Sequence, residues 1–338
     1  MRDSDQETVL VLGARGRLGM AAVRAFSAQG WRVLAQVRPS AQGEPIKNVS
    51  WLPIAVHDTP ALARAARGAA CVLHALNPPY PAWDRLAMPL LEAGMRVART
   101  LDARLLLPGN VYNYGASMPA LLSEDTPQAA HTRKGRLRIR MEQALRDAAQ
   151  AGDLRSVVIR AGDFFGSGTG GWFDLALVRN ITRGKLTYPG PLQVPTAWAY
   201  LPDLAETFVR VSRQLGAAED AAAAFDAFHF QGHTLTGQQW IHLLEGTARE
   251  QRWIGDDEDL RVASLPWNWM RLGGALLPMW RELVEMQYLW NTPHALSGTK
   301  LAALIGPEPR TALPAALDRS LQNLGLVGAS PCALQAWA

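Results

Sequence analysis

Short apolar runs alternate with segments of helical periodicity along the first half of the chain. The runs are almost continuously hydrophobic, which is typical of strands buried on both faces of a parallel sheet. They lie at residues 8–13, 31–37, 49–56, 70–76, 104–109 and 154–162. Between them, the pattern predicts a helix after the first run and helices near residues 59–68, 83–100 and 133–151. This alternation predicts an α/β fold in which helices cover both faces of a parallel sheet.

The pattern becomes irregular beyond residue 162. Glycines and prolines interrupt residues 166–195, and the later predicted elements are a strand at 227–232 and helices at 202–215, 236–246, 267–290 and 311–324. We therefore predict a sheet domain at residues 1–165, to which 194–232 returns. The remaining segments, 166–193 and 233–338, are expected to form a smaller, mostly helical substrate-binding region. Eight of the twelve tryptophans lie between residues 172 and 290, which predicts either an aromatic core or a ligand pocket in this region.

Composition narrows the class of protein. Of the 338 residues, 48% are hydrophobic and 19% charged, which excludes a wholly disordered chain. The net charge of +4 is too small to argue for a nucleic-acid partner, and the histidines lack metal-ligand spacing. We find neither a signal-peptide core nor an apolar run long enough for a membrane span, and Cys71 and Cys332 do not suggest a disulfide framework. These observations predict a cytoplasmic protein, monomeric or homodimeric, that acts on a small molecule without a metal.

Three glycines stand between the first strand and the first helix, in the spacing Gly13-x-x-Gly16-x-x-Gly19. The first glycine permits a tight turn, the second permits close approach of a diphosphate, and the third lets helix and strand pack closely. A diphosphate would then lie at the positive end of the helix, beside Leu18. The spacing in this strand–loop–helix context predicts a dinucleotide site.

Arginines surround this loop. Arg15 and Arg17 lie within it, and the second strand ends at Arg38, where an NAD-binding protein usually carries an acid. A guanidinium group binds phosphate through paired hydrogen bonds. We therefore expect the 2′-phosphate of NADP at this position, although NAD remains an alternative. Asp58, after the third strand, is a candidate for contact with the adenine.

These residues, in this order, resemble the extended short-chain dehydrogenase/reductase superfamily. The resemblance covers most of the chain and rests on four segments: GARGRLG (13–19), NVYNYG (110–115), IRAGDFFGSG (159–168) and AYLPDLAETFVRV (199–211). It implies a Rossmann fold, that is, a doubly wound parallel sheet, with a small C-terminal substrate region. It also implies NAD(P)-dependent oxidoreductase or epimerase chemistry that depends on a Ser or Thr and a Tyr-x-x-x-Lys pair.

The sequence departs from the superfamily at that catalytic set. Counted back from Gly115, the serine position holds Asn110; counted back from Glu142, the tyrosine and lysine positions hold Lys134 and Arg138. A branch resembling isoflavone reductases works with a lysine on this helix, which implies Lys134 as the general acid and a contact to the cofactor. Desolvation or neighbouring arginines would lower the pKa of such a lysine toward neutrality. Asn110 could bind both cofactor and substrate oxygen.

Other assignments stay open. Tyr112 and Tyr114 are alternative proton donors. Cofactor contacts are expected at the carboxyl ends of the fourth and sixth strands, at Asn77, Pro78, Gly162 and Phe164. Two functions are compatible with these residues. One is reduction or epimerisation of a small carbonyl or enone-like metabolite, and the other is a catalytically inactive protein that senses or regulates through bound NAD(P).

Overall fold

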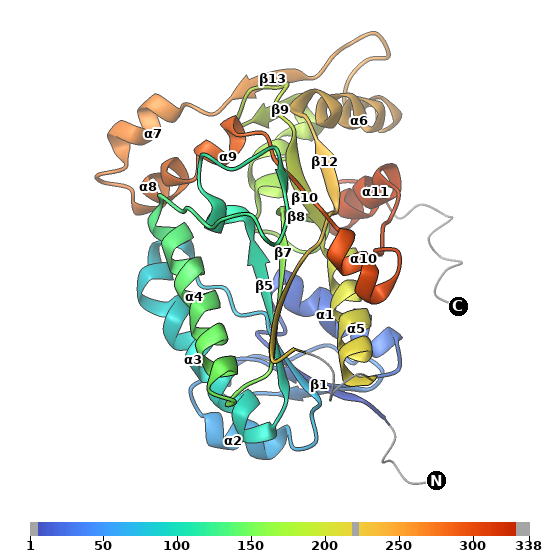
Figure 1. The fold of residues 1–338 in the computed structure, drawn as a ribbon. Helices are drawn as coiled ribbons and strands as arrows, with labels where there is room; N and C mark the ends of the chain where they lie inside the picture. Colours follow the sequence, from blue (N-terminus) through green and yellow to red (C-terminus); the bar gives the residue numbers. More distant parts are fainter. Residues whose placement is uncertain (1–5, 218–222, 329–338) are drawn as a thin grey trace.

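The computed structural model describes residues 6–217 and 223–328, and a parallel sheet of seven strands runs through its centre (Figure 1). The strand order is β11-β7-β5-β4-β1-β2-β3, and every neighbouring pair is parallel. The strands are β1 (Thr8–Leu12), β2 (Arg32–Gln36), β3 (Val49–Leu52), β4 (Cys71–His74), β5 (Arg104–Asn110), β7 (Ser156–Ala161) and β11 (Phe225–His229). The predicted fold class is therefore confirmed.

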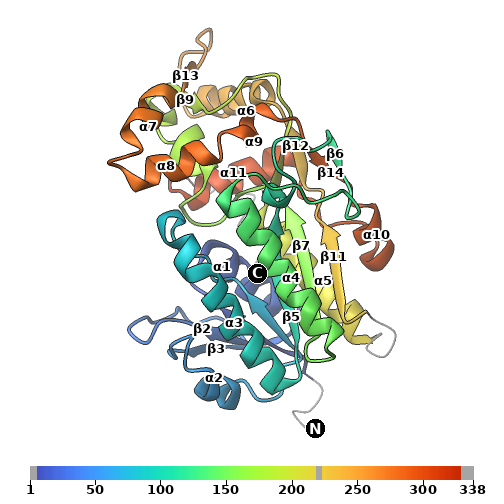
Figure 2. The same ribbon diagram turned by 60° about the vertical axis from the view of Figure 1, so that its left-hand side comes forward.

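Helices cover both faces of the sheet (Figure 2). On one face, α2 (Thr59–Ala65), α3 (Trp83–Leu101) and α4 (Arg133–Gln150) share a core with sheet residues such as Leu10 and Leu105. On the other face, α1 (Arg17–Ala28) and α5 (Leu201–Ala217) pack on residues such as Val9 and Ile159. Because side chains alternate along a strand, the fully buried run of β1 supplies both cores.

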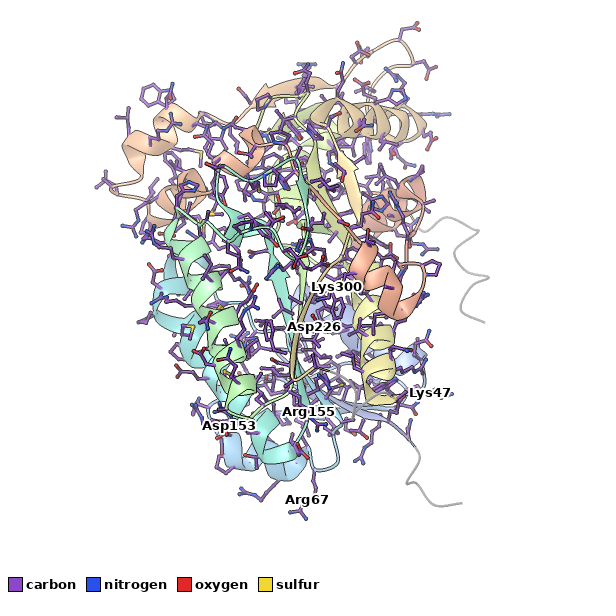
Figure 3. The ribbon with its side chains drawn as sticks, viewed as in Figure 1. Lys47, Arg67, Asp153, Arg155, Asp226 and Lys300 are labelled. Atoms are coloured by element: carbon purple, nitrogen blue, oxygen red, sulfur yellow. The ribbon has the colours of Figure 1, made fainter. Side chains whose placement is uncertain are left out.

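The edge strand β11 is held by a late helix. Lys300 of α10 (Thr299–Ile305) forms an ion pair with Asp226 and donates to the carbonyl oxygen of Ala227 at 3.1 Å (Figure 3). The ammonium group also lies 5.0 Å from the centre of the Phe228 ring. These contacts attach the end of the chain to the sheet.

A second core lies beyond the carboxyl ends of the strands. It is built by the three-stranded sheet β8 (Asp163–Phe165), β10 (Thr196–Tyr200) and β12 (His233–Leu235), by strand β9 (Lys185–Tyr188), and by α6 (Gly237–Glu250) and α11 (Leu313–Asn323). The exposed strand β13 (Arg261–Ser264) pairs with β9 at the surface. Trp198, Trp240 and Trp290 are buried there among other aromatic rings. A two-stranded ladder, β6 (Leu121–Leu122) with β14 (Ala295–Leu296), lies beside this region.

The prediction of a single helix over residues 267–290 is wrong, because the structure has three shorter helices there. These are α7 (Trp267–Gly273), α8 (Pro278–Glu285) and α9 (Tyr288–Asn291). Leu277 is extended before Pro278, whose ring favours the first turn of a new helix. Gly273 allows Trp280 to fold back, since a Cβ at residue 273 would lie 2.6 Å from the indole ring.

Two further features bear on the expectations from sequence. Cys71 is buried in β4, whereas Cys332 lies outside the described residues. None of the helices in residues 6–217 and 223–328 combines the length and the apolar character that crossing a membrane requires.

Candidate active site

The glycine-rich turn after β1 packs closely against α1 and the end of β2. Gly13 has φ +76°, and its amide donates to the Gln36 side chain at 2.9 Å. A Cβ at residue 19 would lie 2.2 Å from the carbonyl oxygen of Gly13, so only glycine lets α1 approach the turn. The first amides of a helix have no intrahelical partners, and at the N-terminus of α1 no side chain caps them. The turn therefore fits a diphosphate at this helix end.

A second glycine-rich loop, residues 166–171, closes over Arg17. Its guanidinium donates to the carbonyl oxygens of Ser167 at 2.7 Å and Phe164 at 3.2 Å. A Cβ at residue 171 would lie 2.3 Å from Arg17 Nη1, so a side chain there would displace the guanidinium from its present position. Burial lowers the Arg17 pKa, although attraction to Asp174 and Asp163 opposes this. Arg17 thus connects α1 to this loop, and its guanidinium is hydrogen-bonded to backbone carbonyl oxygens.

A cavity of about 2040 Å³ extends along the carboxyl edge of the sheet from these loops. Typical ligand sites are roughly 300–1,000 Å³, so this one has room for a dinucleotide and a second molecule. The wall includes most of the residues predicted to bind the cofactor or substrate: Gly13, Arg15, Gly16, Arg17, Leu18, Arg38, Asn77, Pro78, Asn110, Tyr112, Gly162 and Phe164.

Four predicted residues are not part of that wall. Gly19 acts through packing, as described above. Asp58 instead caps α2, accepting from the Ala61 amide at 3.1 Å, which gives its carboxylate a local role at the helix terminus. Tyr114 and Lys134 are both buried in polar networks outside the cavity wall.

Two tyrosines meet inside the cavity. The hydroxyls of Tyr112 and Tyr80 are 2.8 Å apart, and burial raises the pKa of both, that of Tyr80 to about 12. Asn110 holds the start of the Val111–Tyr114 turn, because its side-chain oxygen accepts from the Tyr112 amide at 3.1 Å. The Asn110 oxygen is therefore occupied, and its amide nitrogen is the group left to face a ligand.

Arg138 also lines the cavity. It donates to the Pro108 carbonyl oxygen at 3.1 Å, and its guanidinium carbon lies 5.0 Å from the centre of the Trp83 ring. Burial lowers the Arg138 pKa, although nearby Tyr112 and Glu142 favour the charged form. The residue predicted to stand at the superfamily's lysine position thus presents a cation to the cavity.

Asp163 contributes the one carboxyl group in the described cavity wall. It follows Gly162, where a Cβ would lie 2.1 Å from the Ala197 carbonyl oxygen, so glycine lets β8 pass close to β10. Within residues 6–217 and 223–328 its carboxyl group has no hydrogen bond or ion pair from another side chain. Burial raises the pKa of Asp163 to about 7, although attraction to Arg17 opposes the rise.

Lys134 is only 1% exposed and belongs to a network of ion pairs between α4 and α8. Its ammonium binds Glu282 and lies 2.7 Å from Glu285, while Arg133 binds Glu282 at 2.8 Å and Asp84 at 3.1 Å. Burial is the largest single effect and opposes ionisation of Glu282 and Glu285, but the hydrogen bonds and attraction of Lys134 and Arg133 together outweigh it, so the pKa of both carboxyls is lowered. This network is called the α4–α8 clamp below.

Tyr114 lies in a different buried network behind the cavity. Its hydroxyl is 2.7 Å from His229 Nε2 and accepts from Arg160 at 2.7 Å. Arg160 in turn donates two hydrogen bonds to Glu142, at 3.0 and 2.6 Å. Glu142, the residue from which the catalytic positions were counted in the sequence, is therefore bound by Arg160. The network attaches α4 to β7 and β11.

Tyr80 and Asp163 are functional candidates that the sequence motifs do not predict. Tyr80 follows Asn77-Pro78-Pro79 after β4, and Asp163 follows β7, so both come directly after parallel strands. Carboxyl ends of parallel strands share one edge of the sheet, and that signal could have grouped them. The sequence alone did not reveal that the Asp163 carboxyl group is buried, and burial is what raises its pKa.

Comparisons with known proteins agree with this geometry. The model of the NAD dependent epimerase/dehydratase family matches residues 9–223. No characterised protein sequence matches the chain significantly. Among solved structures, UDP-glucose 4-epimerase from Stenotrophomonas maltophila, with bound NAD and formylated UDP-arabinopyranose, is similar with a TM-score of 0.72 at 14% identity, over 98% of this chain and 100% of that one.

Two other epimerase structures share the fold. The Thermotoga maritima UDP-glucose 4-epimerase with UDP-glucose has a TM-score of 0.69 at 15% identity, over 94% of this chain and 98% of that one. The Brucella ovis UDP-glucose 4-epimerase with NAD has a TM-score of 0.60 at 16% identity, over 80% and 92%.

Proposed function

Because the chain belongs to the NAD dependent epimerase/dehydratase family, within the extended short-chain dehydrogenase/reductase superfamily, we propose that it is an NADP(H)-dependent oxidoreductase or epimerase-like enzyme acting on a carbonyl compound. One observation carries the proposal. The uncapped start of α1 opens into a cavity whose wall also holds the carboxyl group of Asp163, which no side chain in the described part of the chain pairs with. The first feature suits a diphosphate, and the second suits proton exchange with a substrate oxygen.

Cofactor choice depends on the cations beside the turn. Arg15 and Arg38 are exposed, line the cavity and form no ion pair within the described part of the chain. The neighbouring acid, Glu44, is paired with Arg24 at 3.0 Å. A ribose 2′-phosphate would find two available guanidinium groups here, whereas a 2′-hydroxyl would lack the carboxylate it usually binds. These features support NADP over NAD, even though the similar epimerase structures contain NAD.

The experiment that tests this cofactor preference titrates purified protein with NADPH and with NADH. Charge-assisted hydrogen bonds contribute roughly 1.5–3 kcal/mol, so Arg38→Glu should weaken NADPH about 10- to 100-fold while NADH affinity changes less than about threefold. Arg67→Glu is the control, because this exposed arginine follows α2 far from the cavity (Figure 3). Equal losses for both nucleotides would reject the phosphate assignment, and no binding of either would reject the function.

Proton transfer is assigned here to Asp163, with Tyr112 and Tyr80 beside it. When bound, the nicotinamide exchanges a hydride with the substrate carbon. The carboxyl group of Asp163 gives a proton to the substrate oxygen in reduction or takes one in oxidation, and solvent restores its state. A group that titrates near neutral pH can do both. Arg138 supplies a fixed positive charge to the same wall.

A non-catalytic sensor is the second candidate. It is favoured by the residues at the superfamily's tyrosine and lysine positions, because Lys134 is paired with Glu282 and Glu285 instead of facing the cavity. The general-acid role of Lys134 stays a prediction from sequence. A sensor would bind NADPH without turnover of any carbonyl, and it would not depend on the protonation state of Asp163.

A further inference from the structure

Two segments outside the central sheet form a largely apolar part of the cavity wall. One is the helical turn around residues 172–179, and the other runs from residue 265 to α8. Every cavity-lining residue of these two segments is apolar except Arg179. Trp172, Leu175, Met270 and Trp280 are its largest members. This surface, called the apolar wall below, is where a substrate would lie beyond the cofactor.

The cations of the cavity are concentrated elsewhere. Arg15, Arg17, Arg24 and Arg38 belong to the glycine turn, α1 and the segment after β2, and Arg138 lies on α4. A diphosphate buried against the apolar wall would have Arg179 as its one charged partner in the two segments. Phosphate groups without cations or hydrogen-bond donors are costly to desolvate. The wall is therefore poorly suited to a nucleoside diphosphate-linked substrate, unlike the similar structures solved with UDP-sugars.

The apolar surface continues to the outside of the molecule. Leu175 is 59% exposed and Met279 is 44% exposed, and both also line the cavity. Trp269, Leu272 and Leu276 of the same α7–α8 region are more than 70% exposed. Contiguous exposed apolar surface on a monomeric protein usually marks a binding site. Here it forms the rim of the cavity, which indicates an entrance for apolar molecules.

The α4–α8 clamp explains how such a wall is held open. Glu282 and Glu285 point from α8 to Lys134 and Arg133. On the same helix, Met279, Trp280 and Leu283 line the cavity. The charged face of α8 is thus buried against α4, and its apolar face is presented to the ligand space. The wall therefore keeps its shape without a ligand to fill it.

From the wall, the rim and the placement of the cations, we propose that the substrate is an uncharged molecule whose reacting group carries an extended hydrocarbon portion, a chain or fused ring that lies along the apolar wall. The placement of the substrate's reacting group depends on the proposed function, because that group must reach Asp163. The binding of the hydrocarbon portion is independent of the cofactor.

The test uses unreactive straight-chain 1-alkanols from butanol to decanol, titrated into the full-length protein and followed by tryptophan fluorescence. Trp172 and Trp280 lie in the wall and report on its occupancy. Burying one methylene contributes about 0.8 kcal/mol, so affinity should rise about threefold to fourfold per added carbon until the wall is filled. UDP, titrated in parallel, should not displace decanol.

Two substitutions localise the effect. Leu175→Lys places a cation at the rim and should weaken decanol at least tenfold. Leu121→Lys is the matched control, because Leu121 is 63% exposed and does not line the cavity, and it should leave the affinity unchanged. Melting temperatures establish that both variants are folded.

The outcomes separate this proposal from the proposed function. A flat alkanol series, displacement of decanol by UDP, or equal effects of the two substitutions would overturn the apolar substrate, even if NADPH binds. Steep chain-length dependence without NADPH binding would support the apolar wall and reject the oxidoreductase.

Discussion

At the residue scale, the environment of a side chain decides its chemistry more than its type does. Asp163 and Asp58 both follow strands of the same sheet. Asp58 is exposed and caps α2, whereas Asp163 lies in the cavity wall, where burial raises the pKa to about 7. The charge of Asp163 helps to raise the pKa of Tyr80, Tyr112, Tyr188 and Tyr288, and Arg17 is the cation that attracts the carboxylate. A carboxyl group in such surroundings can hold a proton under ordinary conditions.

Asp163→Asn tests this directly. We expect turnover to fall at least about 100-fold, since general acid–base catalysis contributes roughly 10²- to 10⁴-fold, with NADPH affinity unchanged within about threefold. In carboxyl-labelled protein, NMR should show one aspartate titrating near pH 7 that the variant lacks. The control is Asp153→Asn, an exposed aspartate outside the cavity wall (Figure 3). An Asp163 signal that titrates near pH 4 would contradict the role.

At the element scale, charged clusters place helices that the hydrophobic pattern does not position. The α4–α8 clamp unites Lys134 and Arg133 with two glutamates about 150 residues later in the chain. The pattern over residues 267–290 indicated one helix, but Gly273 and Pro278 divide it. Division allows α8 to turn its charges toward α4 while α7 extends the rim of the cavity.

Lys134→Met should destabilise the protein by up to about 3–5 kcal/mol, because it removes the buried cation of the clamp and leaves Glu282 and Glu285 with the more exposed Arg133. Arg140→Met, an exposed position on the same helix, should change the free energy of unfolding by less than about 0.5 kcal/mol. Urea unfolding measures both.

Lys134→Arg distinguishes the clamp from general-acid catalysis. Arginine preserves the positive charge, but its pKa is too high for a proton donor. We therefore expect Lys134→Arg to retain turnover within about fivefold. Loss of turnover with stability and NADPH affinity retained would instead establish the general-acid role predicted from sequence.

At the scale of the whole molecule, buried histidines couple stability to pH. Burial lowers the pKa of His74, His229 and His233 to about 4 each. Unfolding returns them to about 6.5, so the unfolded chain binds protons that the native protein does not between these values. Asp163 acts in the opposite direction: its contribution to stability is present below pH 4 and is lost as the pH rises through 7.

The net effect of three histidines and one aspartate is a fall in stability on acidification. We expect the free energy of unfolding to decrease by about 1.4–2.7 kcal/mol per pH unit between pH 6 and 4.5, the equivalent of one to two protons. Urea unfolding at several pH values measures this slope. His229→Gln should reduce it by about one proton, and the exposed His57→Gln should not. Constant stability from pH 7 to 4.5 would contradict the assignment.

The sequence by itself determined the sheet and the dinucleotide turn, because both depend on local rules. Continuous apolar runs can be buried only between two layers of helices, and Gly13, Gly16 and Gly19 are needed wherever a strand, a turn and a helix pack this closely. Only the tertiary structure decided which charged groups face the ligand. Arg17 is bound by the loop at 166–171 and Lys134 by α8, whereas Asp163 has no side-chain partner among the residues that the structure describes. Each outcome depends on residues more than a hundred positions away or on burial. Pairing and desolvation are properties of the assembled molecule, and these set whether a charged side chain stabilises the fold or does chemistry.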